Sequence, residues 1–146
     1  MLPPSPAALV GKPAWWFHPL GVEGKRAEAL RTLGKHAEKL WAWADLPVPE
    51  AHAKLALLPG IGPWTIGSVM ASAMGDADAV AVGDFHLKNV VANALAGEPR
   101  GTDDRMLELL APYAGQRGRV IRLLLLDGHR APSYGPRKRI LPMARW

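Results

Sequence analysis

The chain has 146 residues, 49% of them hydrophobic, and a formal charge of +5, which fits one folded domain rather than a disordered chain. Because it has no cysteine, disulfides, thiolate zinc sites and iron–sulfur clusters are excluded. The five histidines are too scattered in the sequence to suggest a metal site by themselves.

The N-terminal half is predicted to be helical, with breaks at prolines and glycines. Ser5 and Pro6 have the residue types of an N-cap and a first helical position, so a short helix should start there. Apolar residues three and four apart predict an amphipathic helix over 24–44, and a short helix is expected over 50–57. A loop that contains residues 15–17 joins the first two helices. Four tryptophans are assigned to the core: Trp15, Trp16, Trp41 and Trp43.

The second half is predicted to hold four more helices, at about 63–74, 84–95, 102–113 and 117–127. Pro63 suits the first position of a helix, while Thr102 and either Gly83 or Asp84 can serve as N-caps. The loop "GDADAVAVGD" lies between the first two of these helices, and its Asp76 and Asp78 are expected to be solvated. No strand pattern or repeat is present, so the predicted fold class is all-α, a compact bundle of about seven short helices.

Positive charge is concentrated at the C-terminus. Residues 117–146 carry eight Lys or Arg and one acidic residue, whereas residues 1–116 carry ten basic and twelve acidic residues. A basic segment of this kind often contacts phosphates, but a basic tail that is merely solvated is about as common. We divide the chain into a domain over 1–130 and a basic, proline-rich tail over 131–146.

The stretch "LPGIGPWTIGSVM", residues 58–70, combines a turn with a helix start. Pro59 presets φ for a turn and Gly60 can supply the positive φ that a type II turn requires. Gly62 precedes the helix start, where free amides and the helix dipole favour an anion such as phosphate. The alternative is a tight corner between two helices that binds no ligand.

Two segments carry a resemblance to a known family. "LALLPGIGPWTIGSVM" resembles the helix-hairpin-helix motif of DNA repair glycosylases, and "DAVAVGDFHLKNVV" resembles the Gly/Pro-Asp segment of the helix-hairpin-helix-GPD superfamily. The match places Asp84 at the catalytic aspartate of that family. The flanking "SPAALVGKPAWWFHPLGVEGKRAEALRTLGKHAEKL" and "APYAGQRGRVIRLLLL" are weaker matches, so the likeness covers roughly residues 5–130.

Within the superfamily, the sequence resembles the bacterial 3-methyladenine DNA glycosylases of alkylation repair. Members with lyase activity place a lysine where this chain has Trp64, because an amine must form a Schiff base with the sugar. Endonuclease III and adenine-mismatch types usually hold an iron–sulfur cluster on four cysteines, which are absent here. Members of the alkylation-repair branch usually have a further segment before the position of Ser5, so this chain is expected to be N-terminally short.

The resemblance implies a catalytic Asp84, whose other possible role is only that of an N-cap. It implies no required cofactor, but one Na⁺ or K⁺ on the main-chain carbonyls of the hairpin. The expected cation ligands are Ala56, Leu58 and Gly60. The expected DNA-binding residues are Gly60, Ile61, Gly62, Trp64 and Thr65. The residues expected to line the base pocket are Trp64 and Tyr113.

The predicted function is therefore that of a monofunctional glycosylase acting on double-stranded DNA with alkylated bases. No apolar run resembles a signal peptide or a bilayer span, so we expect a cytoplasmic, nucleoid-associated protein without membrane contact. We also expect it to be a monomer. One alternative is a non-catalytic or truncated helix-hairpin-helix module that only binds DNA. Another is a small helical interaction protein whose hairpin is only a corner.

Overall fold

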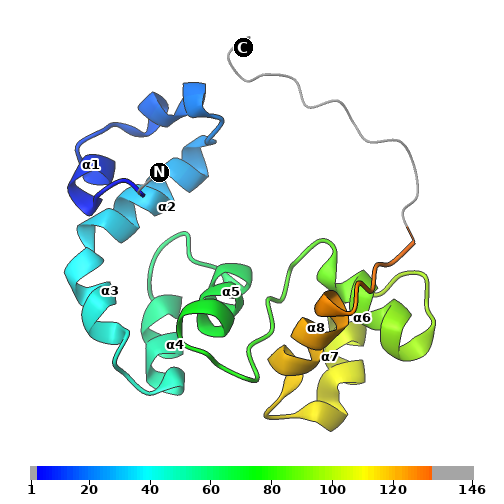
Figure 1. Cartoon of the computed structure of the whole chain (residues 1–146). Helices are drawn as coiled ribbons and strands as arrows, with labels where there is room; N and C mark the ends of the chain where they lie inside the picture. Colours follow the sequence, from blue (N-terminus) through cyan, green and yellow to red (C-terminus); the bar gives the residue numbers. More distant parts are fainter. Residues whose placement is uncertain (1–2, 133–146) are drawn as a thin grey trace. The chain divides into compact units, whose positions relative to one another are not determined.

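The computed structural model describes residues 3–132 and shows an all-α protein (Figure 1). Within this range the chain forms eight α-helices and two 3-10 helices, with no strand. No helix among the described residues is long and apolar enough to cross a membrane. The described chain divides after Ile61 into two compact units. Of the predicted basic tail, residues 133–146 lie outside the described residues.

The first unit contains α1 (Pro6–Val10), the 3-10 helix η1 (Ala14–Leu20), α2 (Gly24–Lys35), α3 (Ala37–Trp43) and α4 (Val48–Ala56). The predicted N-cap is confirmed, because the Ser5 hydroxyl accepts the Ala8 N–H at 3.2 Å. Helix α1 packs on α2 at Gly34, where a Cβ atom would lie 2.9 Å from Cγ2 of Val10. The absence of a side chain at Gly34 therefore lets these two helices approach closely.

Two of the elements predicted for this unit are wrong. The single helix predicted over 24–44 breaks at His36, whose backbone has φ −106° and ψ 14° and whose N–H donates to the carbonyls of Leu33 and Thr32. Gly34, a poor helix former, lies two residues before this break. The loop predicted around residues 15–17 is the 3-10 helix η1, which ends at Gly21 with φ +80°.

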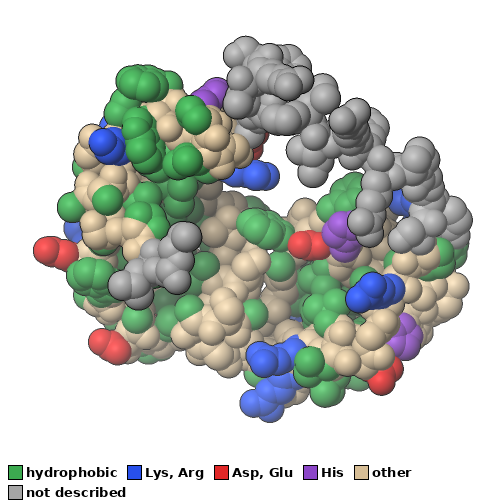
Figure 2. All heavy atoms as spheres, turned by 45° about the horizontal axis from the view of Figure 1, so that its top comes forward, with side chains coloured by type: hydrophobic (Ala, Val, Ile, Leu, Met, Phe, Trp, Pro, Cys, Tyr) green, Lys and Arg blue, Asp and Glu red, His purple; other side chains and the backbone are tan. Residues whose placement is uncertain are grey.

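The tryptophans of this unit do not form its core. Trp15 is 71% exposed, Trp41 is 68% exposed, and Trp16 is also exposed. Trp43 is half-buried. Since α3 begins anew after His36, the spacing that placed Trp41 on the buried face does not continue across the break. Figure 2 shows hydrophobic side chains at the surface over the N-terminal part of the chain. The buried apolar residues of the unit are Phe17, Ala27, Ala51, Leu55 and Leu58.

The second unit contains α5 (Pro63–Ala73), α6 (Leu87–Ala96), α7 (Asp103–Leu110), the 3-10 helix η2 (Ala111–Tyr113) and α8 (Arg117–Leu126). Pro63 is the first residue of α5, as predicted, and the Thr102 hydroxyl caps α7 by accepting the Arg105 N–H at 3.1 Å. Pro112 marks the change from α7 to the tighter η2. The buried apolar cluster of α6, α7 and α8 consists of Val91, Met106, Leu110 and Ile121.

The loop before α6 is held between α5 and α8 by two glycines. A Cβ atom at Gly67 of α5 would lie 2.3 Å from the Val80 carbonyl oxygen. A Cβ atom at Gly118 of α8 would lie 2.7 Å from the Ala79 carbonyl oxygen. Only a residue without a side chain leaves room for the loop backbone at either point.

Asp78 in this loop is not solvated as expected. Its carboxylate accepts the backbone N–H of Arg117 at 3.0 Å and Nε of the same residue at 2.8 Å, and it also pairs with Nη2. The hydrogen bond from the Arg117 side chain lowers the pKa of Asp78 to about 2, against a smaller opposing effect of burial. The ion pair fastens the loop to the first residue of α8. Asp76 is half-buried, and its carboxylate accepts the Asp78 N–H at 2.8 Å.

Candidate active site

Asp84 lies in a tight turn directly before α6. Gly83 has φ +92°, and the Asp84 N–H donates to the Ala81 carbonyl at 3.2 Å. Oδ1 of Asp84 accepts the N–H groups of His86 and Leu87 at 2.8 and 2.9 Å. Helix α6 therefore begins at Leu87 rather than near residue 84, because residues 84–86 form the capping turn. The N-cap position of α6 is His86, so the prediction of Gly83 or Asp84 at that position is wrong. Oδ1 of Asp84 still accepts the N–H of the first helical residue, Leu87, which leaves its second oxygen for another role.

The second oxygen of Asp84 meets a side chain from α5. Nε1 of Trp64 donates to Oδ2 at 2.9 Å, so three N–H groups hold the carboxylate. Burial raises the pKa of Asp84, but the hydrogen bonds from Trp64, Leu87 and His86 together outweigh it and hold the pKa below its ordinary value. Asp84 is therefore ionised at neutral pH, in a fixed orientation.

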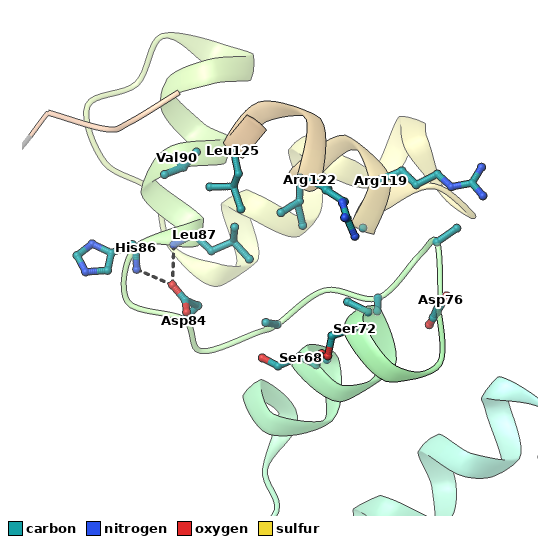
Figure 3. Close-up of a pocket in the computed structure, with 18 residues that line it drawn as sticks. Ser68, Ser72, Asp76, Asp84, His86, Leu87, Val90, Arg119, Arg122 and Leu125 are labelled. Atoms are coloured by element: carbon teal, nitrogen blue, oxygen red, sulfur yellow. Dashed lines mark hydrogen bonds between the residues drawn. The ribbon is translucent and has the colours of Figure 1, made fainter. Parts of the chain in front are cut away.

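Asp84 lines a cavity of about 670 Å³ within the second unit (Figure 3). Its walls come from α5, the loop over 75–84, α6 and α8, and much of the lining is apolar. A volume of this size is typical of small-molecule sites. Figure 3 shows Asp84 and Asp76, the carboxylates of the lining, on opposite sides of the cavity. Asp84 is thus a carboxylate without a neighbouring acid on the cavity wall.

Basic and hydroxyl groups complete the lining. Arg119 and Arg122 of α8 and His86 are lining residues, but in Figure 3 the Arg119 guanidinium and the His86 imidazole point away from the cavity. Ser68 and Ser72 of α5 line it as well, and their hydroxyls donate to the carbonyls of residues four positions earlier in the helix. Each serine oxygen keeps its lone pairs available to accept from a ligand, while the arginines can only donate.

The hairpin turn has the backbone conformation expected from its sequence. Gly60 has φ +83°, and the Ile61 N–H donates to the Leu58 carbonyl at 3.1 Å. A Cβ atom at Gly60 would lie 3.2 Å from Cβ of Ala29 in α2. Gly60 is therefore required by the turn, and a side chain there would also be tightly packed against α2 within the first unit.

The predicted DNA-binding residues divide at the boundary between the units. Gly60 and Ile61 end the first unit, and Gly62, Trp64 and Thr65 begin the second. Gly62 is the N-cap of α5, and nothing lies within 4 Å of a Cβ atom built there. The backbone at the start of α5 is accordingly open to approach on that side.

The two residues predicted for the base pocket do not line the cavity. Trp64 is exposed and directs its indole N–H to Asp84. Tyr113 ends η2, is 42% exposed, and is not part of the lining. Trp64 therefore contacts Asp84, whereas Tyr113 lies outside the cavity lining. Their contact with a base stays a prediction.

The carbonyls predicted to hold an alkali cation belong to the end of α4 and the turn that follows. The Leu58 carbonyl accepts the Ile61 N–H, which leaves its second lone pair free. A cation at the carbonyls of Ala56, Leu58 and Gly60 stays a prediction. Among the residues that the structure describes, no three His, Asp or Glu side chains gather as a metal site.

No family model matches the chain, and comparisons with curated proteins and with solved structures find no match. The residues of the site therefore carry the functional argument.

Several residues around Asp84 were not singled out from the sequence. The cavity residues Ser68, Arg119 and Arg122 lie on α5 and α8. No motif in the sequence links them to Asp84. Gly67 is the exception, since an isolated glycine inside an apolar helical pattern indicates close approach of another backbone. That signal was available, but the loop that approaches Gly67 was not predictable from it.

Proposed function

We propose that this protein is a monofunctional DNA glycosylase that hydrolyses the N-glycosidic bond of alkylated purines in duplex DNA. The observation that carries the proposal is the ionised Asp84, fixed by three N–H donors on the wall of a cavity large enough for a base. The resemblance of residues 55–74 to a helix-hairpin-helix motif and of the segment around Asp84 to its Gly/Pro-Asp loop supports the same function.

A fixed carboxylate suits the chemistry of this reaction. As the bond between C1′ and the base breaks, positive charge develops on the deoxyribose, and an ionised Asp84 facing C1′ stabilises it. The carboxylate also orients the attacking water and accepts its proton as the new C–O bond forms. The hydrogen bonds from Trp64, His86 and Leu87 hold the carboxylate in one orientation before the substrate arrives.

The choice of an alkylated purine follows from the leaving group. Alkylation at N3 or N7 makes the base cationic, so that it departs without the proton that a second carboxylic acid would supply. Asp76, the other carboxylate of the cavity lining, lies across the cavity and accepts the Asp78 N–H. This arrangement favours a substrate that needs no general acid.

The absence of lyase activity follows from Trp64. An indole N–H cannot attack the sugar to form a Schiff base, and here it is bonded to Asp84. The reaction then ends with hydrolysis and leaves the DNA backbone intact.

The proposed DNA contact is made by the hairpin and the start of α5. The first-turn amides of α5 lack intrahelical acceptors, and the backbone at Gly62 is open on the Cβ side, so a phosphate oxygen can approach it. This contact does not read bases, so recognition of the damaged base rests on the cavity after the nucleotide has been extruded.

The test is release of free base from N-methylated duplex DNA by the whole chain at one low salt concentration. We expect release by the wild type, loss of release in Asp84→Asn with DNA affinity retained, and little change in Asp76→Asn, which alters the other carboxylate of the cavity. DNA binding without release by the wild type would contradict the proposal and favour a module that only binds DNA. Gly62→Asp should weaken binding, and unchanged binding would contradict the hairpin assignment.

A further inference from the structure

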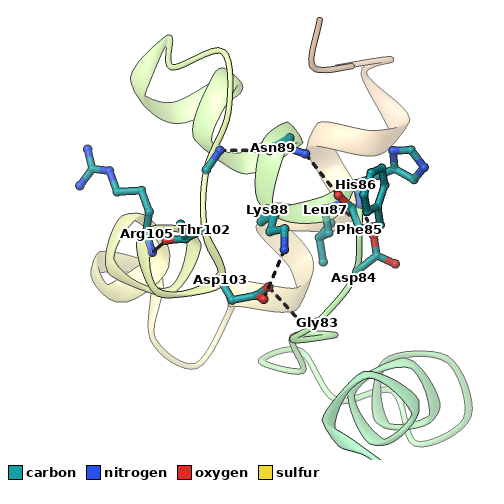
Figure 4. A network of polar contacts seen from close by, with 11 residues as sticks. Gly83, Asp84, Phe85, His86, Leu87, Lys88, Asn89, Thr102, Asp103 and Arg105 are labelled. Atoms are coloured by element: carbon teal, nitrogen blue, oxygen red, sulfur yellow. Dashed lines mark hydrogen bonds and ion pairs between the residues drawn. The ribbon is translucent and has the colours of Figure 1, made fainter. Parts of the chain in front are cut away.

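The backbone on both sides of Asp84 is held by side chains (Figure 4). Oδ1 of Asp103, the first residue of α7, accepts the Gly83 N–H at 3.1 Å. Nδ2 of Asn89 in α6 donates to the Phe85 carbonyl at 3.2 Å. The peptide groups Val82–Gly83 and Phe85–His86, one removed from Asp84 on either side, are thus each fixed by a hydrogen bond.

Asp103 is itself anchored. Its Oδ2 lies 3.6 Å from Nζ of Lys88, so a cation of α6 faces the same carboxylate that binds the Gly83 N–H. The side chains of this ion pair are 28% and 30% exposed, which limits how far they can move in solvent. The helix that carries Asp103 is capped by the Thr102 hydroxyl at its start.

The segment that leads into α7 is pinned to α6. Oδ1 of Asn89 accepts the Gly101 N–H at 3.1 Å, and Nδ2 of Asn93 donates to the Glu98 carbonyl at 3.3 Å. A Cβ atom at Gly101 would lie 2.7 Å from Cβ of Ala92, so this segment lies directly on α6. Asn89 therefore joins the start of α7 and the turn around Asp84 through one side chain.

A glycine at this turn makes such support necessary. Gly83 adopts a positive φ, and a glycine has more conformational freedom to lose than any other residue. Without an acceptor for its N–H, the turn could rotate and carry the Asp84 carboxylate away from its donors.

We propose that Asp103 is a positioning residue for the proposed glycosylase reaction, acting through the Gly83 N–H, with Asn89 supporting the other side of the turn. This inference rests on the proposed function for its catalytic consequence. The placement of the Asp84 carboxylate can be measured whether or not that function holds.

The kinetic test compares four variants of the whole chain. In Asp103→Ala the Gly83 N–H loses its acceptor, and a misplaced carboxylate should lower kcat for base release by about 10- to 100-fold while KM stays within about twofold. Asp103→Asn keeps an oxygen acceptor and should restore kcat to within about threefold of the wild type. Asp104→Ala removes the neighbouring exposed carboxylate and should retain wild-type kcat. Lys88→Met removes the ion pair that anchors Asp103 but leaves the acceptor of the Gly83 N–H, so it should lower kcat less than Asp103→Ala does.

The second readout is the titration of the Asp84 carboxyl by ¹³C NMR, assigned with Asp84→Asn. The pKa of Asp84 should be below its ordinary value in the wild type and in Asp104→Ala, and should rise in Asp103→Ala. If Asp103→Ala fails to fold, Asn89→Ala should produce the same rise. Unchanged titration and unchanged kcat in a folded Asp103→Ala would overturn the proposal. If the wild type releases no base, the proposed function fails, and the titration alone decides the positioning role.

Discussion

Replacing Asp78 by asparagine should destabilise the protein by removing the charged contact between the loop and α8. The pKa of Asp78 lies at about 2 instead of 3.8 because of Arg117. At about 1.4 kcal/mol per pKa unit, this difference corresponds to roughly 2.5 kcal/mol. Solvent screening reduces it, since 27% of the side chain is exposed. We therefore expect Asp78→Asn to lower the free energy of unfolding by about 1.5–2 kcal/mol, and Tm by about 5 °C.

The same interaction predicts a pH dependence with a definite sign. The folded pKa is lower than the unfolded one, so the stabilisation is fully present above about pH 4 and is lost as pH falls towards 2. Urea unfolding followed by circular dichroism should show the difference between wild type and Asp78→Asn undiminished from pH 7 to pH 5. By pH 3 roughly half of it should be lost.

Further variants test whether the loss of stability comes from the Asp78–Arg117 ion pair or from the change in net charge. Asp104→Asn changes an exposed carboxylate of the same unit and should leave stability within about 0.5 kcal/mol of the wild type. Arg117→Met should destabilise as Asp78→Asn does, and the double variant should lose much less than the sum. A difference between wild type and Asp78→Asn that stays constant from pH 5 to pH 3, or that is absent at pH 7, would refute the reasoning.

Three other predictions follow from single contacts. Gly67→Ala should lower the free energy of unfolding in urea by more than about 2 kcal/mol, because its Cβ would lie too close to the Val80 carbonyl oxygen of the loop. Gly62→Ala, where the Cβ would have open space, should change it by less than about 1 kcal/mol. Thr102→Ala should lose about 1 kcal/mol with the cap of α7, and Thr102→Ser should restore most of it; equal stability of the two would contradict the cap. Trp64→Phe removes an N–H donor and should raise the pKa of Asp84. The acidic limb of the pH profile of base release should then shift to higher pH. An unshifted limb would show that the indole hydrogen bond does not lower the pKa of the carboxyl.

Local features of this chain were predictable because their causes lie within a few residues. The caps at Ser5 and Thr102, the start of α5 at Pro63 and the positive φ of Gly60 all follow from the conformational preferences of those residues. The all-α class follows from apolar spacing in the same way.

Features that depend on distant segments were not predictable. Asp78 and Arg117 are 39 residues apart, and nothing in the sequence of the loop marks Asp78 as an ion-pair partner. Trp64 and Asp84 are 20 residues apart, and their hydrogen bond depends on how the intervening loop returns past α5. The sequence offered Asp84 as a candidate residue, whereas the N–H donors that hold its carboxylate were not predictable.

The close packing of the loop backbone against Gly67 and Gly118 restricts which positions of this sequence can vary. Both glycines face the backbone of the loop rather than its side chains. Away from Asp78, Gly83 and Asp84, substitutions in the loop that preserve its course should be accepted, whereas a methyl group added to either helix would displace the whole segment. In a library of random variants, the two helix positions should remain glycine while the neighbouring alanines of the loop diversify.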